Sequence, residues 1–218
     1  MCLKIDQMKA KKELNIPLGI NENGEQEFLD LNKARNVLIA GKTGSGKSIF
    51  LHKAIKHLTK NYSKDEVRLF LIDLKQTEFL RYKDYVIYDL EQAKGILNDL
   101  VKKINAEVEK EEIPTIIIVD ECCDLLLDYE TLSLLKTIAA KGRAINAHLI
   151  LSTQMFAPDV LVPELKANLQ TRICFPVADI DDSCLIIHEE GAEKLKTGEF
   201  LYKSPSSDKV RKLKSKKF

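Results

Sequence analysis

A glycine-rich motif constrains the fold of this chain more than any other feature. Residues 41–48 read Gly41-Lys42-Thr43-Gly44-Ser45-Gly46-Lys47-Ser48 and match the pattern G-x-x-x-x-G-K-[S/T]. The motif follows the apolar run Val37–Ala40, which predicts a buried strand, and opens a stretch at 47–58 with helical character. Its glycines let backbone N–H groups converge on phosphate oxygens, and the helix N-terminus adds partial positive charge. We therefore predict that residues 41–48 bind ATP, with Lys47 reaching the β- and γ-phosphates and Ser48 ligating Mg²⁺.

Apolar runs alternate with helical stretches along the rest of the chain. We predict further strands at 67–73, 115–120, 148–153 and 172–175, an edge strand at 200–202, and helices at 90–109 and 129–140. This alternation predicts an α/β fold with a mostly parallel sheet and helices on both faces. An Asn-Gly pair at 23–24 between two short apolar runs adds a small N-terminal β-hairpin.

Charge divides the chain into three parts. Residues 1–31 form a lysine-rich arm and the hairpin, 32–202 the ATPase core, and 203–218 a basic tail. The tail has a net charge of +6, whereas the whole chain, with 34 basic and 33 acidic residues, has a formal net charge of +1. Because like charges at this density resist folding, we expect a disordered end that either solubilises the chain or contacts a phosphate backbone.

The composition favours a soluble, cytoplasmic protein with no membrane partner. No run approaches the roughly 18 apolar residues of a membrane span, and the N-terminus lacks the apolar core of a signal peptide. The five cysteines include no Cys-x-x-Cys pair. We therefore expect buried free thiols rather than disulfides or a zinc site.

Polar residues end three of the predicted strands: Asp73, Asp120-Glu121 and Thr153-Gln154. Because the carboxyl ends of parallel strands meet at one edge of a sheet, these residues should lie near the glycine-rich motif. The order of the motifs, with another strand between them in the sequence, also predicts that the strands ending at Ala40 and Asp120 lie side by side.

These residue types suit nucleotide hydrolysis. Asp120 would hold Mg²⁺ beside Ser48, and Glu121 would polarise the attacking water. Gln154 would touch the γ-phosphate and report hydrolysis. The sequence thus predicts an enzyme that converts ATP and water to ADP and phosphate.

Taken in order, the motifs resemble the motor core of FtsK/SpoIIIE-type DNA translocases. The resemblance implies a RecA-like P-loop NTPase fold, a ring of six subunits and ATP-driven movement along DNA. It also implies that Arg143 is an arginine finger that reaches the ATP of a neighbouring subunit. Arg172 is the rival candidate, but its place in an apolar strand indicates a structural role. The matching segments are 16–20, 38–48, 67–75, 118–121 with 124–125, 141–144, 148–151, 153–154, 166–168, 172–173 and 191–195.

The sequence departs from the family pattern where the family contacts DNA. Family members usually follow Thr-Gln with Arg-Pro, but here Met155 and Phe156 stand there. A second basic position falls near Ile180, among aspartates. Of the family's channel-lining basic residues only Lys166 is evident, and each missing phosphate contact reduces the slope of the salt dependence by about one unit. Lys42, Lys75 and the basic tail are the other cationic candidates.

Three functions stay open at this point. The first is a minimal translocase or helicase acting on single- or double-stranded DNA, of the kind that mobile elements or phages use. The second is a secretion-type ATPase that moves polypeptide. The third is a nucleotide-dependent assembly module with little turnover.

Overall fold

The computed structural model describes residues 13–107, 111–156 and 161–215. The predicted arm at 1–12, the end of the predicted helix at 108–109 and the last tail residues, 216–218, lie outside the described residues.

A ten-stranded sheet organises the described part of the chain, in the order β2-β1-β10-β9-β8-β3-β7-β6-β4-β5. The strands from β8 to β5 run parallel to one another, whereas β1, β2, β9 and β10 pair antiparallel. The strand bounds are β1 Asn15–Ile20, β2 Gln26–Asp30, β3 Val37–Ala40, β4 Arg68–Ile72, β5 Val86–Ile87, β6 Thr115–Val119, β7 Ala147–Thr153, β8 Thr171–Cys174, β9 Glu199–Ser204 and β10 Ser207–Lys214.

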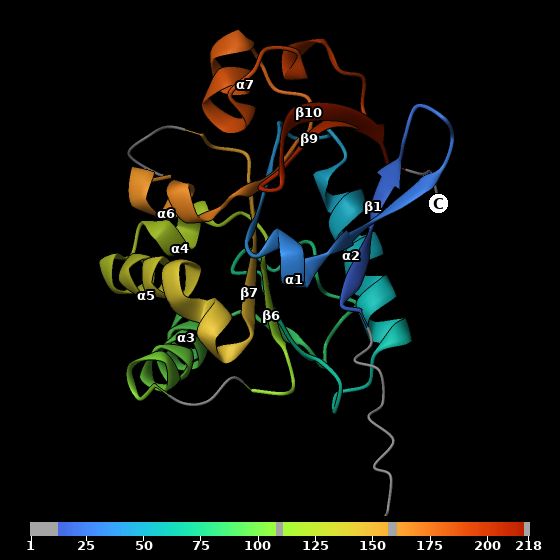
Figure 1. Cartoon of the computed structure of the whole chain (residues 1–218). Coiled ribbons are helices and arrows are strands. Elements are labelled where there is room, and N and C mark those ends of the chain that lie inside the picture. The colour runs from blue at the N-terminus through green and yellow to red at the C-terminus, as the bar shows by residue number, and fades with distance from the viewer. Residues whose placement is uncertain (1–12, 108–110, 157–160, 216–218) are drawn as a thin grey trace, which may run out of the picture.

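Helices cover both faces of this sheet, which confirms the predicted α/β class (Figure 1). In β6, Ile116 and Ile118 pack on the side of α2, while Ile117 and Val119 pack on the side of α3 and α5. A strand buried on both faces can be almost entirely apolar, as β6 is after Thr115. The helix bounds are α1 Leu31–Ala34, α2 Lys47–Asn61, α3 Leu90–Asn105, α4 Cys123–Leu126, α5 Tyr129–Lys141, α6 Pro163–Asn168 and α7 Ile180–Ile187, with short 3₁₀ turns η1 Gly142–Ile145 and η2 Ala192–Lys194.

The N-terminal hairpin forms where the Asn-Gly signal predicts it. The Asn21 side chain accepts hydrogen bonds from the backbone N–H groups of Asn23 and Glu25, both at 3.0 Å. Gly24 has a φ of 83°, a left-handed conformation that favours glycine. The turn therefore joins β1 to β2 as an antiparallel pair.

The basic tail is the main correction to the sequence-based picture. Residues 207–214 form strand β10, which pairs with β9 and touches β1, so β9 is not an edge strand. Two of its basic side chains pair with acids of other strands: Lys212 pairs with Glu199 on β9, and Arg211 pairs with Glu27 on β2. Leu213 is buried beneath the charged surface. Charge density within one window could not reveal these distant partners.

A second correction concerns strand order. The strand β7 lies between β3, which carries the glycine-rich motif, and β6, which carries Asp120. The two motif strands are therefore separated by one strand rather than adjacent. This insertion brings the end of β7, with Thr153 and Gln154, directly between the two motifs.

The described cysteines are free thiols. Cys122, Cys123 and Cys174 are buried as expected, whereas Cys184 is exposed; Cys2 lies outside the described residues. Within the described ranges, no helix combines the length and the apolar character needed to cross a membrane.

Candidate nucleotide-binding site

Glycines shape the loop between β3 and α2. Gly41, Gly44 and Gly46 have φ values of 151°, 73° and 118°, which L side chains rarely adopt. A Cβ added to Gly41 would lie only 2.6 Å from the Cβ of Phe175. Position 41 can therefore be occupied only by glycine in this conformation. The loop ends at Gly46, which is the N-cap of α2.

The C-terminal part of the chain holds the glycine-rich loop through backbone hydrogen bonds. Lys42 N–H donates to Pro176 O at 2.9 Å, and Gly198 N–H donates to Ser45 O at 2.9 Å. Beneath them, the buried ring of Phe175 packs against Phe50 and Phe200. The loop conformation is thus supported by segments that lie more than a hundred residues away in the sequence.

Lys47 lies against this loop. Its Nζ donates to Gly41 O at 2.5 Å and to Lys42 O at 3.1 Å, and the side chain is buried. Burial lowers the pKa of Lys47, while Glu121 and Asp120 act in the opposite direction. The lysine is therefore held where phosphate oxygens would replace the backbone carbonyls as its acceptors.

Asp120 follows β6 and lies among other carboxylates. Burial, together with the nearby charges of Glu78, Asp73 and Glu121, raises its pKa to about 6, and Lys47 opposes this shift. A half-buried carboxylate under such repulsion is stabilised by a cation, and oxygen ligands are those that Mg²⁺ prefers. No group of three or more His, Cys, Asp and Glu among the described residues could hold a metal by itself. The residues thus fit an ion that takes most of its ligands from phosphate and water, as Mg²⁺ commonly does.

Glu121 is held in a fixed position beside Asp120. Its backbone φ is 47°, in the left-handed region, and its side chain is buried. The carboxylate accepts hydrogen bonds from Gln154 N–H at 3.2 and 3.3 Å, and its Oε1 lies 3.1 Å from the Thr153 hydroxyl. The end of β7 therefore orients the carboxylate predicted to act on water.

Gln154 joins the same cluster through its side chain, since its Oε1 accepts a hydrogen bond from the Thr43 hydroxyl. The loop residues, Asp120, Glu121 and Gln154 thus meet at one edge of the sheet. Lys42 and Thr43 are exposed there, and Ser48 is half-buried in the first turn of α2. Lys75, one of the cationic candidates, pairs with Asp124 at 3.5 Å.

Asp73 also lies at this edge of the sheet, but its side chain binds backbone N–H groups. Its buried Oδ2 accepts hydrogen bonds from the N–H groups of Thr77, Glu78 and Phe79, at 2.9 to 3.0 Å. The loop held in this way places Glu78 near Asp120, a neighbour that sequence reasoning missed. Only the fold of the loop brings Glu78 there, so the sequence carries no local signal for it.

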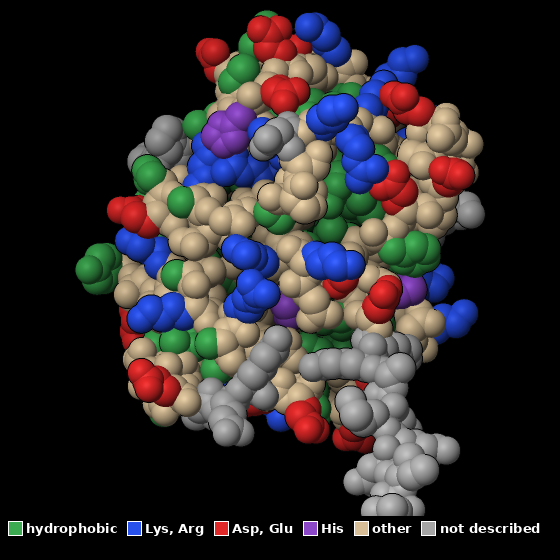
Figure 2. All heavy atoms as spheres, viewed as in Figure 1, with side chains coloured by type: hydrophobic (Ala, Val, Ile, Leu, Met, Phe, Trp, Pro, Cys, Tyr) green, Lys and Arg blue, Asp and Glu red, His purple; other side chains and the backbone are tan. Residues whose placement is uncertain are grey.

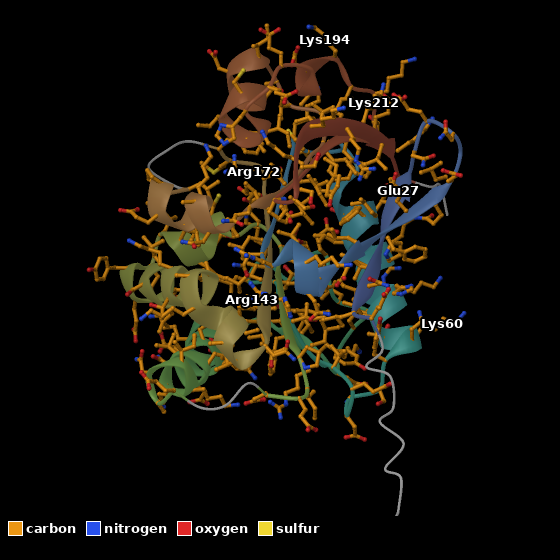
Figure 3. All side chains as sticks on the ribbon, in the orientation of Figure 1. Glu27, Lys60, Arg143, Arg172, Lys194 and Lys212 are labelled. Atoms are coloured by element: carbon orange, nitrogen blue, oxygen red, sulfur yellow. The ribbon has the colours of Figure 1, made fainter. Side chains whose placement is uncertain are left out.

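Arg143 lies at the other end of the molecule from this cluster. It is exposed on η1, just before β7 begins, whereas Thr153 ends β7 at the glycine-rich loop (Figure 3). Six strand steps of about 3.3 Å separate the two ends by about 20 Å. A bound nucleotide of the same chain is therefore out of reach of Arg143.

Arg172 and Lys166 form a separate basic group near α6 and α7. The buried Arg172 guanidinium donates to the carbonyls of Ile186 at 2.8 Å and Leu169 at 3.3 Å, and it also contacts His188. These contacts tie β8 to α7 and give Arg172 a structural role. Lys166 is half-buried on α6, and burial followed by the charge of Arg172 lowers its pKa.

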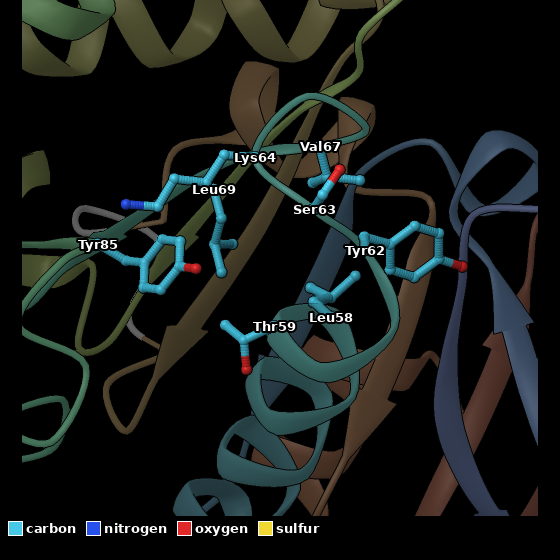
Figure 4. Close-up of a pocket in the computed structure, with 8 residues that line it drawn as sticks. All are labelled: Leu58, Thr59, Tyr62, Ser63, Lys64, Val67, Leu69 and Tyr85. Atoms are coloured by element: carbon cyan, nitrogen blue, oxygen red, sulfur yellow. The ribbon is translucent and has the colours of Figure 1, made fainter.

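A small cavity lies away from these groups (Figure 4). It is lined at the C-terminal end of α2 and the start of β4 by residues that include Leu58, Tyr62 and Tyr85. Its volume is about 10 Å³, room for about one water molecule. This cavity is therefore not a ligand site.

Sequence comparisons point to one family. Residues 5–106 match the model of the FtsK/SpoIIIE family. The DNA translocase FtsK of Leptospira interrogans is 34% identical over 237 aligned residues, covering 92% of this chain and 25% of the relative. The DNA translocase FtsK of Treponema pallidum is 33% identical over 222 residues, covering 87% of this chain and 28% of the relative. The chain thus spans about a quarter of the length of these curated relatives.

Solved structures share the fold. The pCW3 conjugation coupling protein TcpA, a monomer form with ATPγS, superposes with a TM-score of 0.79 at 24% identity, over 94% of this chain and 66% of that chain. The type VII secretion ATPase EccC of Thermomonospora curvata gives a TM-score of 0.78 at 21% identity, over 94% and 29%. The DNA-packaging ATPase B204 of Sulfolobus turreted icosahedral virus gives 0.61 at 21%, over 85% and 100%.

These structural likenesses establish the P-loop ATPase fold. The sequence matches extend over about nine tenths of the chain. The family model and these relatives confirm the resemblance to the FtsK/SpoIIIE family that the motifs predicted.

Proposed function

We propose that this chain is an Mg²⁺-dependent ATPase that works as the motor of a ring-forming DNA translocase. The observation that carries the proposal is the convergence of Lys47, Asp120 and Glu121 at the glycine-rich loop, with Glu121 oriented by the end of β7. Phosphoryl transfer needs positioning and charge neutralisation more than covalent catalysis, and these groups supply both.

The side chains have distinct tasks in hydrolysis. Lys47 exchanges its carbonyl acceptors for β- and γ-phosphate oxygens and neutralises their charge. Asp120 and Ser48 would hold Mg²⁺, which supplies further charge neutralisation on the phosphates. Glu121 accepts the proton of a water whose oxygen bonds to the γ-phosphorus, while the bond from that phosphorus to the β–γ bridging oxygen breaks. Gln154 lies where it can sense the γ-phosphate through Thr43.

A neighbouring subunit completes the site in this proposal. Because Arg143 lies about 20 Å from the loop of its own chain, it can act as an arginine finger only on another copy. A closed ring, a hexamer in the family pattern, gives every loop one such neighbour. Lys166 would contact the DNA phosphates from each subunit, and we expect the motor to work in the cytoplasm. Its use by a mobile element or phage, and any unwinding of DNA, belong to the same proposal.

The test is the ATPase rate with and without single- and double-stranded DNA. The unchanged chain should hydrolyse ATP with Mg²⁺ and be stimulated by at least one form of DNA. Lys47→Ala should abolish hydrolysis, and Arg143→Ala should lower it about 10³-fold or more. Lys60→Gln, in the last turn of α2, is the matched charge control (Figure 3). It should change neither the ATPase rate without DNA nor the rate with DNA.

Two results would contradict the proposal. An ATPase that is indifferent to both forms of DNA would remove the translocase, and an unchanged rate in Arg143→Ala would remove the finger. Tight ATP binding with negligible turnover at high protein concentration would instead support the assembly module.

One observation favours a second candidate, an ATPase that moves polypeptide. At two positions where the family carries DNA-facing basic residues, this chain has Met155 and Ile180, which are 54% and 43% exposed. Exposed apolar side chains there suit a polypeptide better than a phosphate backbone. Hydrolysis stimulated by an unfolded polypeptide but not by DNA would select this candidate.

A further inference from the structure

A second pocket lies beside Arg143, at the edge of the sheet opposite the glycine-rich loop. It has a volume of about 90 Å³, and its lining includes Asn32, Arg35, Arg143, His148, Asn168 and Gln170. Several Lys and Arg side chains gather in the middle of this face (Figure 2), the region where Figure 3 places Arg143. The described residues that line the pocket include two arginines and no acid.

Arg35 enters this pocket from the end of α1. Its guanidinium Nη1 donates to Gln170 Oε1 at 3.3 Å, so the side chain is directed toward β8. Its backbone has a φ of 62° and a ψ of −104°, an unusual conformation for a residue other than glycine. The arginine thus lies on the pocket wall even though its backbone would favour glycine.

The pocket is built on a rigid support. Asn36 is buried next to Arg35, and its Nδ2 donates to Ala139 O at 2.8 Å and to Asn168 O at 3.2 Å. Its Oδ1 accepts from Leu149 N–H at 3.1 Å. One side chain thereby joins α5, α6 and β7, the elements around Arg143. The backbone elements around the two arginines are therefore held together by buried hydrogen bonds.

The side chains that line this pocket and the volume of the pocket limit which ligands it can bind. Two guanidinium groups with neutral amides around them attract an anion, and guanidinium geometry matches phosphate oxygens. A volume of about 90 Å³ holds several waters but is far below the roughly 300 Å³ of a site that encloses a whole small ligand. The occupant is thus one anionic group of a molecule bound mainly elsewhere.

We propose that Arg35 is a second guanidinium that acts between subunits, joining Arg143 on the terminal phosphate of ATP held by a neighbouring copy. The inference rests on the proposed function, since it needs a ring in which Arg143 faces the neighbour's loop. The chain's own loop lies about 20 Å away along β7, so a second copy must supply the phosphate. Both arginines then stabilise the charge of the transferring phosphoryl group.

Because the backbone conformation of Arg35 favours glycine, substitution by glycine should remove the guanidinium group without destabilising the fold. Arg35→Gly removes the guanidinium and relieves the left-handed conformation, so the melting temperature should stay the same or rise. The ATPase kcat should fall about 10- to 100-fold, as expected for losing one charge-assisted hydrogen bond in the transition state. Lys33→Gln is the matched control, because Lys33 lies on α1, two residues before Arg35, pairs with Asp30 and lines a different groove.

Mixing experiments separate action between subunits from a structural role. Lys47→Ala retains both arginines but lacks its own phosphate lysine, whereas Arg35→Gly retains its own loop. In rings assembled from equal amounts of the two, about a quarter of the interfaces join an intact loop to an intact Arg35. We expect ATPase activity to recover toward that fraction of the unchanged protein, well above either variant alone.

The outcomes distinguish this inference from the proposed function. If Arg143→Ala loses activity while Arg35→Gly keeps its full kcat, the inference is overturned and the motor stands. If Arg35→Gly loses activity but mixing with Lys47→Ala restores none of it, Arg35 does not act on a neighbour. If neither arginine matters, both the inference and the finger of the proposed function are wrong.

Discussion

Two successive carboxylates after β6 have opposite surroundings. Asp120 lies near Glu78, Asp73 and Glu121, and its pKa rises to about 6. Glu121 is instead fixed by Gln154 N–H and lies beside the Thr153 hydroxyl. These surroundings suit the proposed roles, in which Asp120 holds a cation and Glu121 receives a proton. Two predictions at the residue scale follow from this difference.

The first prediction concerns Thr153, a positioning residue for Glu121. In Thr153→Val the hydroxyl 3.1 Å from Glu121 Oε1 is lost. We expect kcat for ATP hydrolysis to fall about tenfold, the value of one orienting hydrogen bond, with KM for ATP nearly unchanged. Thr153→Ser restores the hydroxyl and should restore kcat. A rise in KM without a change in kcat would show that Thr153 serves binding instead.

The second prediction concerns stability in metal-free protein with a chelator present. Because the pKa of Asp120 is about 6 in the folded state and near 3.9 in an unfolded chain, folding takes up protons between pH 4 and 6. The free energy of unfolding therefore falls as pH rises through this window. Asp120→Asn should be more stable than the unchanged protein by about 1–2 kcal/mol at pH 7.5, with allowance for partial solvent exposure.

The same comparison at pH 4 supplies the control. There Asp120 is protonated in the folded state, so the stability difference between Asp120→Asn and the unchanged protein should nearly vanish. Denaturant titrations at both pH values measure it. An equal difference at pH 4 and 7.5 would mean that the substitution acts through packing.

The sequence alone identifies most of the residues at this site, but not the residues that hold them in position. The motif at 41–48 and the acids after an apolar strand carry local signals, and the structure brings them together. The neighbours Glu78 and Gly198 carry none, because a loop and a distant hairpin bring them there. Local patterns thus identify the groups that do chemistry better than the groups that hold them.

At the scale of elements, the loop after β4 depends on one carboxylate. Asp73 accepts hydrogen bonds from the N–H groups of Thr77, Glu78 and Phe79. We predict that Asp73→Ala lowers the free energy of unfolding by about 2–4 kcal/mol, because three donors lose their acceptor. Denaturant titration measures this loss.

A conservative variant tests the cause. Asp73→Asn keeps an acceptor oxygen and should lose clearly less stability than Asp73→Ala. If both substitutions are equally mild, the loop satisfies its N–H groups with water and does not depend on Asp73.

The strand β10 gives a second prediction at this scale. Ending the chain after residue 206 removes Leu213, which is 2% exposed, and uncovers Phe200 and Tyr202 on β9. We expect the shortened protein to lose its cooperative unfolding transition or to precipitate, as exposed strand edges promote association. The control keeps the strand but neutralises exposed charges, as in Lys209→Gln with Lys214→Gln. A folded, active truncation would show that residues 207–218 are the dispensable tail that their charge suggests.

Elements differ in how far the sequence predicts them. The strands β3, β4, β6 and β7 consist mostly of apolar residues, and the sequence places them within one or two residues. The strand β10 is hidden by its charges, because its partner acid Glu27 is 184 residues from Arg211. The order of parallel strands is hidden as well, since register and neighbours depend on tertiary packing.

At the scale of the whole molecule, binding to DNA must rely on local charge. The chain has a formal net charge of +1, so any attraction depends on groups such as Lys166. We predict that Lys166→Gln weakens DNA binding nearly equally for all base sequences. The slope of log affinity against log salt should decrease in magnitude by about one unit.

Titrations at several salt concentrations measure this slope. Lys60→Gln is the control, because Lys60 and α6 lie on opposite sides of the molecule (Figures 1 and 3). An unchanged slope in Lys166→Gln would remove Lys166 from the set of phosphate contacts.

The position of β7 has a consequence for communication within a ring. At one end of β7, Thr153 and the adjoining Gln154 contact Glu121, and at the other end β7 follows η1, which carries Arg143. In the proposed ring, this one extended strand would span the distance between the ATP bound by its own protomer and the ATP bound by the next protomer. In that ring, a small shift of β7 on hydrolysis would move Arg143 relative to the neighbouring ATP. ATP hydrolysis that proceeds from one protomer to the next would then need no connection other than the seven residues of β7.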